Sequence, residues 1–186
     1  MEKPSNINEN TIKVYLKMQL PQFPDTNIEI SLYENVSNTD EIRSRVAELP
    51  YAFIDASTIC SVEQIMSAVY RVMIEAKYNR LRTKSLHSEI LLALSPTSNI
   101  GEAFKRFGLK ENTKNLLMIQ VSQDQTDTLD KTLVKGDTID FDDKNLEKLS
   151  DVTTIKKIYK IDQSLHLKDN TQLSRVVVNA IQLRGL

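Results

Sequence analysis

The feature that most constrains the fold is one predicted helix with apolar residues on more than one side. Ser61, with Gln64 three residues later, has the pattern of a capping box at the start of a helix. Behind it, apolar residues recur at helical spacing in two sectors, one of Ile65, Ala68, Val69, Val72 and Ala76, the other of Met66, Tyr70, Met73 and Ile74. A helix with so little polar surface is predicted to lie at the centre of the domain or to be covered by a partner.

Two strands are predicted near the start of the chain, because apolar residues alternate there with polar or aromatic ones. Leu16 and Met18 continue an alternation that begins at Val14, and it returns from Ile28 to Leu32 after a proline-rich break. Residues 1–12 are polar and offer no apolar face, so they are expected to form a flexible N-terminal extension. The predicted domain therefore spans residues 13–186.

The other elements follow from local apolar patterns and from residues that start or stop helices. They are a helix capped near Asn38–Asp40 and ended by Pro50, strands at Tyr51–Asp55, Ile90–Leu94 and Asn115–Val121, a short helix at Ile100–Phe107 capped by Ser98 or Asn99, a helix ended by Gly136, and helices at Asp151–Lys160 and Asn170–Arg184. Strands interspersed with helices indicate an α+β fold. We expect a single domain with a mixed, mainly antiparallel sheet and packed helices.

Charge and composition limit the partners of the chain. The 24 basic and 25 acidic residues nearly cancel, so any contact with nucleic acid must be local. The first residues are polar, and no apolar run approaches the roughly 20 residues of a membrane span. We therefore expect an intracellular protein without a membrane partner.

Little in the sequence resembles a catalytic or metal site. The four glycines are scattered singly, so no glycine-rich phosphate loop is predicted. Cys60 is the only cysteine, and His87 and His166 stand far apart, so neither a metal nor another cofactor is expected. The catalytic alternative is a nucleophile, Ser95 or Cys60, beside His87, although such single residues usually have structural roles. The acidic stretch from Asp124 to Asp143 is interpreted as solvated surface.

A basic strip follows the central predicted helix. From Arg71 to Lys84 the chain carries five basic residues and one acidic residue, Glu75, with Tyr78 among them. Such a strip suits a single-stranded RNA end, because cations contact phosphates and an aromatic ring stacks on a base. A solvated run of charges is the alternative. Lys105, Arg106 and Lys110 extend the strip if the fold brings them near.

The residues in and after this strip carry a family resemblance. The stretches Lys77–Ile90 and Leu94–Gly108 closely resemble the kinase-binding subunit family of the KEOPS complex, also called the EKC complex, which includes the PRPK-binding protein. Shorter matches follow the family order at Gln22–Asp25, Glu41–Ser44, Ile155–Lys160 and Val178–Gly185. Two features depart from the family pattern, because residues 1–18 precede its common start and Asn179 stands where relatives often carry Asp.

The resemblance implies a non-catalytic subunit that binds the atypical protein kinase of the complex and supports its activity. It also implies that the subunit helps to recruit transfer RNA through the single-stranded CCA end, so that the complex can install threonylcarbamoyl on the adenosine beside the anticodon. Other subunits, reached through the kinase, carry out that chemistry. A link to telomere maintenance and a location in the nucleus and cytoplasm are further expectations.

Two binding sites are proposed from the resemblance and the residue patterns together. The RNA-binding candidates are Lys77, Arg80, Arg82, Lys84, Lys105, Arg106, Ser98 and Asn99, the last two at a helix N-terminus whose amides could receive a phosphate. The kinase-binding candidates are Val178, Ile181 and Leu183 on the last helix, whose inward stripe is predicted to be Leu173, Val176, Val177, Ala180 and Ile181. Alternatively, all three candidates complete the core. Two other functions stay open: a kinase activator without RNA contact, and a small enzyme that uses His87 or Cys60.

Overall fold

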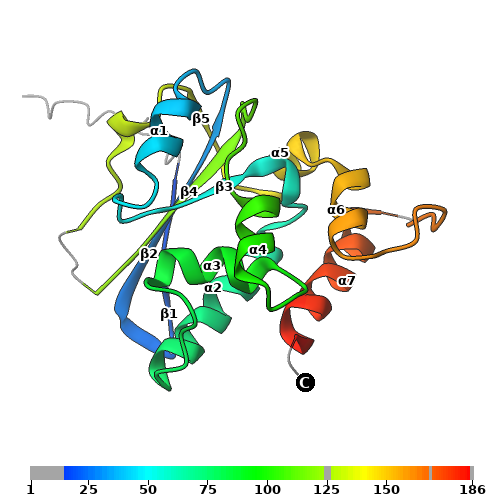
Figure 1. Ribbon diagram of the computed structural model, residues 1–186, viewed down its shortest axis with the longest axis horizontal. Coiled ribbons are helices and arrows are strands. Elements are labelled where there is room, and N and C mark those ends of the chain that lie inside the picture. The colour runs from blue at the N-terminus through cyan, green and yellow to red at the C-terminus, as the bar shows by residue number, and fades with distance from the viewer. Residues whose placement is uncertain (1–14, 124–126, 168, 185–186) are drawn as a thin grey trace, which may run out of the picture.

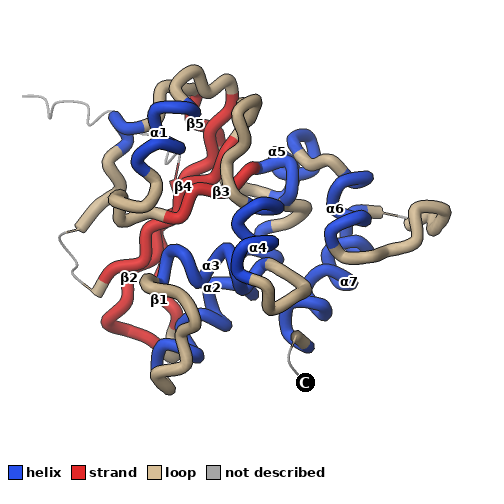
Figure 2. The backbone as a smooth tube through the Cα atoms, in the orientation of Figure 1, coloured by secondary structure: helices blue, strands red, loops and turns tan. Residues whose placement is uncertain are grey.

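The computed structural model describes residues 15–123, 127–167 and 169–184. The predicted N-terminal extension, residues 1–12, and Val14 lie outside this part of the chain. Within it, one sheet carries helices on both faces, with most of the helices on one side (Figure 1). Figure 2 shows the strands running diagonally through the molecule between these layers. The expected α+β architecture is confirmed.

The sheet has five strands among the described residues, and every paired strand is antiparallel to its neighbour. They are β1 (Tyr15–Leu20), β2 (Phe23–Glu34), β3 (Ala52–Asp55), β4 (Leu116–Ser122) and β5 (Asp137–Ile139). The order is β1-β2-β4-β3, and β5 pairs with the end of β2 on the edge that β1 also uses. The predicted pair of strands joined by a turn is confirmed as β1 and β2.

The two faces of the sheet bury two separate cores. Ile28, Ile30 and Leu32 of β2 point into the larger core, which the helices of the chain's middle and end cover. Tyr33 of β2 and Phe53 of β3 point to the opposite face and into the smaller core. This alternation is the period of two that a strand buried on both faces imposes.

Seven α-helices and two short 3-10 helices are described. They are α1 (Thr39–Arg45), η1 (Ala56–Thr58), α2 (Val62–Lys77), α3 (Leu86–Leu94), α4 (Ile100–Phe107), η2 (Lys131–Leu133), α5 (Asp143–Leu149), α6 (Val152–Ile158) and α7 (Asn170–Leu183). Of these, α1 contributes Ile42 to the smaller core, whereas α2, α3 and α7 contribute to the larger one. Most helices therefore lie on the face of the sheet that carries the candidate binding sites described below.

Of the two positions predicted for the helix after Ser61, at the centre of the domain or under a partner, α2 occupies the central one. Helices α3 and α7 pack against it, and the rings of Tyr70 and Phe23 form a T-shaped pair with 6.2 Å between ring centroids. The Ser61 Oγ accepts the Gln64 amide at 3.1 Å, which confirms the cap. The other half of the predicted box is different, because Gln64 Oε1 accepts the Cys60 amide instead.

The strand predicted at Ile90–Leu94 is wrong, because these residues form the second half of α3. The helix begins earlier, where Ser85 and Ser88 cap each other reciprocally. All five residues from Ile90 to Leu94 are buried, so the apolar run carries no one-sided pattern that would reveal a helix. A short run of apolar residues that is buried on all sides has the same sequence pattern in a helix and in a strand.

Two other predicted helix ends are wrong. Gly136 ends no helix; it lies directly before β5, where a Cβ would come within 2.8 Å of the Glu34 carbonyl oxygen. The first helix ends at Arg45 rather than at Pro50. Asn38 does precede that helix, but its side chain instead contacts the backbone of Leu133 and Lys135 and so holds the segment around η2.

Candidate functional site

The basic loop, residues 77–85, runs from the last residue of α2 to the start of α3 and is fixed at both ends by helix caps. At the end of α2, the Asn79 amide donates to the Ala76 carbonyl and the Arg80 amide to the Glu75 carbonyl. Asn79 has a left-handed φ of 53°, which completes a Schellman motif. The other end of the loop is the reciprocal cap of α3. The loop therefore has a defined backbone, and its charged side chains face solvent.

The predicted cations of this region are displayed on the surface. Lys77, Arg80, Arg82 and Lys84 are all exposed. Arg80 forms an ion pair with Glu75 at 2.9 Å, and its guanidinium lies 5.2 Å from the centroid of the Tyr78 ring. Tyr78 is itself 60% exposed. An accessible aromatic ring and four cations thus occur together, as the sequence predicts.

Two further arginines lie beside this loop, and the sequence-based list of candidates missed them. Arg71 Nη2 donates to the Arg184 carbonyl at 2.6 Å, and Arg71 Nη1 donates to the Ile181 carbonyl, so Arg71 satisfies the end of α7. The Arg184 guanidinium in turn donates to the carbonyls of Leu92 and Ser95. Burial lowers the pKa of Arg184, and the positive charge of Arg71 lowers it further.

Together with the loop, these arginines border a hollow of about 440 Å³ between α2 and the end of α7. It is lined by Tyr70, Arg71, Ile74, Glu75, Arg80, Gln182 and Arg184. Arg184 also reaches the Thr97 carbonyl, one residue before Ser98. Arg184 therefore lies near Arg80, with which it lines this hollow, and near the backbone that precedes Ser98. Only a contact between distant segments could reveal this, because residues 71 and 184 are more than a hundred positions apart.

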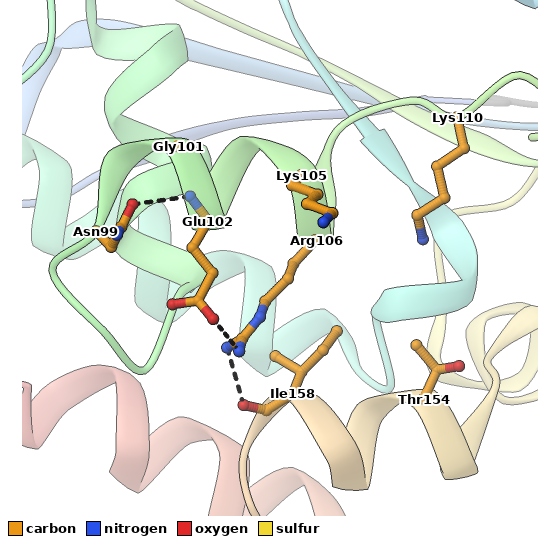
Figure 3. Close-up of a pocket in the computed structure, with 8 residues that line it drawn as sticks. All are labelled: Asn99, Gly101, Glu102, Lys105, Arg106, Lys110, Thr154 and Ile158. Atoms are coloured by element: carbon orange, nitrogen blue, oxygen red, sulfur yellow. Dashed lines mark hydrogen bonds and ion pairs between the residues drawn. The ribbon is translucent and has the colours of Figure 1, made fainter.

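A second hollow, of about 590 Å³, lies between α4 and α6 (Figure 3). It contains the other predicted cations, Lys105, Arg106 and Lys110. The Arg106 guanidinium already has partners within the protein, because it forms an ion pair with Glu102 and donates to the Ile158 carbonyl. Figure 3 also shows Asn99 turned back to cap the helix, where its side-chain oxygen accepts the Glu102 amide at 3.0 Å.

The basic strip therefore divides into two groups. In Figure 1 the loop between α2 and α3 lies at the lower left, whereas the end of α4 lies close to β3. Lys110 contacts Asp55 at the end of β3 at 3.4 Å. Lys105, Arg106 and Lys110 were expected to extend the patch of the basic loop only if the fold brought them near it. In the structure these three residues lie apart from the basic loop.

Comparison with known proteins decides the family. The sequence model of the family described as "Kinase binding protein CGI-121" matches residues 33–185. This chain belongs to the CGI-121 kinase-binding protein family. The match covers every helix of the described residues and confirms the resemblance found in the residues around the basic loop.

Curated relatives in the CGI-121 family are similar over almost the whole chain. An EKC/KEOPS complex subunit CGI121 from Candida glabrata is 44% identical over 176 residues, which cover 92% of this chain and 100% of the relative. The subunit of the same name from Eremothecium gossypii is 45% identical, with coverage of 92% and 99%. The one from Schizosaccharomyces pombe is 36% identical, with coverage of 90% and 99%. The relatives' names describe subunits of a complex.

The residues predicted to bind a kinase in this CGI-121 family member differ strongly in exposure. Ile181 is fully buried and belongs to the core, so it offers no surface. Val178 is half-buried, whereas Leu183 is 60% exposed. Val176, which was expected to point inward, is 39% exposed. Val176 and Leu183 are seven residues apart and therefore lie on one face of α7, so the apolar surface of this helix is formed by a different pair than expected.

Cys60, His87 and Ser95, the residues of the catalytic alternative, each make hydrogen bonds that stabilise the fold. Cys60 is fully buried, and its Sγ contacts Gln64 Oε1 at 3.3 Å. Burial raises the pKa of this thiol to about 11, which keeps it protonated near neutral pH. His87 Nε2 accepts the Val121 amide at 3.1 Å, and the Ser95 hydroxyl accepts the Thr97 amide. The contacts described for these three side chains do not join them into a nucleophile and base pair.

Within residues 15–123, 127–167 and 169–184, no group of three or more His, Cys, Asp or Glu side chains could hold a metal ion. None of the helices in this part of the chain is both long and apolar enough to span a membrane.

Proposed function

We propose that this chain is a subunit of an EKC/KEOPS complex and binds the atypical protein kinase of that complex. In this proposal it supports kinase activity, contacts the other subunits through the kinase, and helps to recruit transfer RNA by the CCA end for threonylcarbamoyladenosine modification. It contributes no catalytic group. Presence in the nucleus and cytoplasm and a role in telomere maintenance belong to the same proposal, on the strength of the family resemblance.

The observation that carries the RNA-binding role is the basic loop with its fixed backbone. Four exposed cations, Lys77, Arg80, Arg82 and Lys84, stand within eight residues of one another, and Tyr78 exposes its ring among them. Cations supply phosphate contacts without regard to sequence, and an exposed ring can stack on an unpaired base. A single-stranded RNA end provides both groups. The loop is therefore proposed as the contact for that end.

The kinase-binding role is supported by the outer face of α7. Large apolar side chains that stay exposed on a small domain often mark an interface, and Val176 and Leu183 form such a pair on one helix face. We assign the kinase surface to this pair, with the half-buried Val178 beside it. Ile181 supports that surface from the core.

Kinase binding is tested by capture of the purified kinase subunit with Leu183→Asp and Val176→Asp. Either change should weaken capture by tenfold or more, because a charge would be desolvated at the centre of an apolar contact. Thr171→Asp is the matched control, since it places the same charge at an exposed position on another side of α7. Unchanged capture by both folded variants would move the interface away from α7, with α2 as the next candidate.

RNA binding is tested by charge reversal at Arg80 and Arg82, each to Glu, with a fluorescently labelled transfer RNA as the probe. Affinity should fall by at least tenfold at low salt, because each reversal replaces a phosphate contact by repulsion. Arg43→Glu is the control, since Arg43 is exposed on α1, which packs on the opposite face of the sheet.

The same variants separate the alternatives. Undiminished RNA affinity together with normal kinase capture would favour a kinase activator that does not contact RNA. The small-enzyme alternative predicts that Cys60→Ala or His87→Gln abolishes transfer-RNA modification by the assembled complex. We expect modification to continue in both variants at temperatures where they remain folded.

A further inference from the structure

A buried carboxylate lies directly beneath the basic loop. Glu89, in the first turns of α3, is only 2% exposed. Its Oε2 accepts three hydrogen bonds from the loop: the Arg82 amide at 3.0 Å, the Thr83 amide at 2.8 Å and the Thr83 hydroxyl at 2.7 Å. One side-chain oxygen therefore holds two successive backbone amides of the loop.

These contacts join a network that fixes the middle of the loop. The Ser88 hydroxyl donates to Thr83 Oγ1 at 3.1 Å, and Ser88 also takes part in the cap with Ser85. The Schellman motif at Asn79 fixes the other end. Glu89 thus supplies the support for the stretch between the two caps, where the backbone amides would otherwise have no helix to bond to.

The cost of burying this charge argues for a specific role. A buried carboxylate is unfavourable unless hydrogen bonds replace its lost hydration. Here the replacement comes from the loop, and the nearby N-terminus of α3 and the positive charge of Arg184 also favour a negative charge. An apolar side chain at this position would fill the same core but leave the loop unsupported. The buried carboxylate therefore serves to hold the backbone of the loop in one conformation.

We propose that Glu89 is a positioning residue for RNA binding. By holding Arg82 and Thr83, it keeps the cations of the basic loop in one arrangement, so that several phosphates can be contacted at once. This inference rests on the proposed RNA-binding function and deepens it. A loop that is already ordered loses less conformational entropy when the RNA binds than a loose one does.

Charge and geometry predict opposite effects of substitution at Glu89. Loss of a negative charge next to Arg82 should strengthen RNA binding if Glu89 acts through its charge alone. If Glu89 acts by holding the loop, Glu89→Ala should weaken binding, whereas Glu89→Gln should preserve it. Gln can place its one carbonyl oxygen where Oε2 now accepts all three hydrogen bonds.

The experiment measures affinity for the labelled transfer RNA with both variants and backbone hydrogen exchange at Arg82 and Thr83. We expect Glu89→Ala to bind about tenfold more weakly, with faster exchange at these two amides, because two or three loop residues become free to move. Glu89→Gln should stay within about threefold of the unchanged protein and retain slow exchange. Rescue by Gln separates positioning from electrostatics.

Two results would overturn the inference. One is unchanged RNA affinity in Glu89→Ala despite fast exchange at Arg82 and Thr83; the other is equal weakening in Glu89→Gln with both amides still protected. Both results differ from a failure of the proposed RNA-binding function, which would appear as unchanged affinity in the Arg80 and Arg82 reversals. Should Glu89→Ala not fold, Thr83→Val removes one of the three hydrogen bonds, and a weakening of about threefold is expected; no weakening would count against the inference.

Discussion

At the scale of single residues, His87 shows how a histidine in a promising sequence context can serve structure. Strands β3 and β4 are antiparallel, and Ala52, the first residue of β3, pairs with Ile119 of β4. The residues of β4 that follow Ile119 therefore have no partner in β3. The Val121 amide, two residues further along β4, donates to His87 Nε2. The imidazole thus replaces a missing strand partner. Burial lowers the pKa of His87 to about 4, so the ring is neutral at physiological pH.

The half-buried imidazole predicts a pH-dependent loss of stability. As pH falls below about 6.5, the unfolded state takes up a proton at His87, whereas the folded state does not until about pH 4. The contribution of neutral His87 is therefore complete above pH 6.5 and lost between there and pH 4, by about 3 kcal/mol at most. His87→Gln can accept the same hydrogen bond without titrating.

The measurement is the difference in free energy of urea unfolding between wild type and His87→Gln across this pH range. Wild type should lose stability relative to the variant as pH falls, and the difference should level off near pH 4. A difference that stays constant with pH would show that His87 titrates normally in the folded protein.

Capping residues were predictable, but their distant partners were not. Ser61 and Asn99 predict the starts of α2 and α4 from the sequence, and both side chains cap their helices in the structure. Gln64, however, extends to the Tyr159 hydroxyl, which itself donates to the Leu94 carbonyl. Local spacing encodes hydrogen bonds within one turn, whereas a bond across 95 positions depends on the whole fold.

At the scale of elements, α7 is fastened to the domain by a side chain from another helix. The last carbonyls of a helix have no partner within it. Here Arg71, from the middle of α2, donates to those of Ile181, Gln182 and Arg184. The face of α7 proposed to bind the kinase is therefore held in place by α2.

Replacement of Arg71 should loosen α7 more than replacement of an exposed arginine nearby. Arg71→Met keeps the length of the side chain but leaves these carbonyls without a donor, which should cost about 1–3 kcal/mol in the free energy of unfolding. Arg80→Met, which removes an exposed ion pair, should cost about 1 kcal/mol or less. Urea unfolding measures both, and hydrogen exchange locates the change. Equal costs for the two variants would contradict this account.

The comparison of α2 with α3 shows which elements a sequence can predict. The cap and long period of α2 indicate a helix whatever surrounds it, and α7 and α4 are found for the same reason. The run from Ile90 to Leu94 resembles a strand in the sequence because the serine cap of its helix lies five residues upstream and every side chain in the run is buried. The outward face of α7 was also misjudged, since two apolar faces on one helix leave the inward direction to the packing.

At the scale of the whole molecule, the near-neutral charge makes RNA binding a local property. With a formal net charge of −1, the chain has little general attraction for a polyanion. The two basic groups, at the loop and between α4 and α6, are kept apart by the fold. The number of cations that one RNA strand meets therefore depends on which group it touches.

The salt dependence of binding should report this number. Single-stranded RNA releases about 0.7 counterions per phosphate contact, so the four cations of the basic loop predict a slope of about −3 for log affinity against log salt. A slope of about −4 would mean that Lys105 and Arg106 also make contact. Fluorescence titrations with transfer RNA at several salt concentrations give the slope. A value near zero would contradict binding through the loop.

The order of elements along the chain has a consequence for biosynthesis. Helix α7 covers part of α2, yet residues 78–169 separate the two helices in the sequence. On the ribosome, α2 is finished long before the helix that shields it exists, and chains made in this order expose apolar surface meanwhile. A nascent chain stalled between these helices would therefore present α2 to chaperones, and the core can close only after nearly the whole domain has been translated.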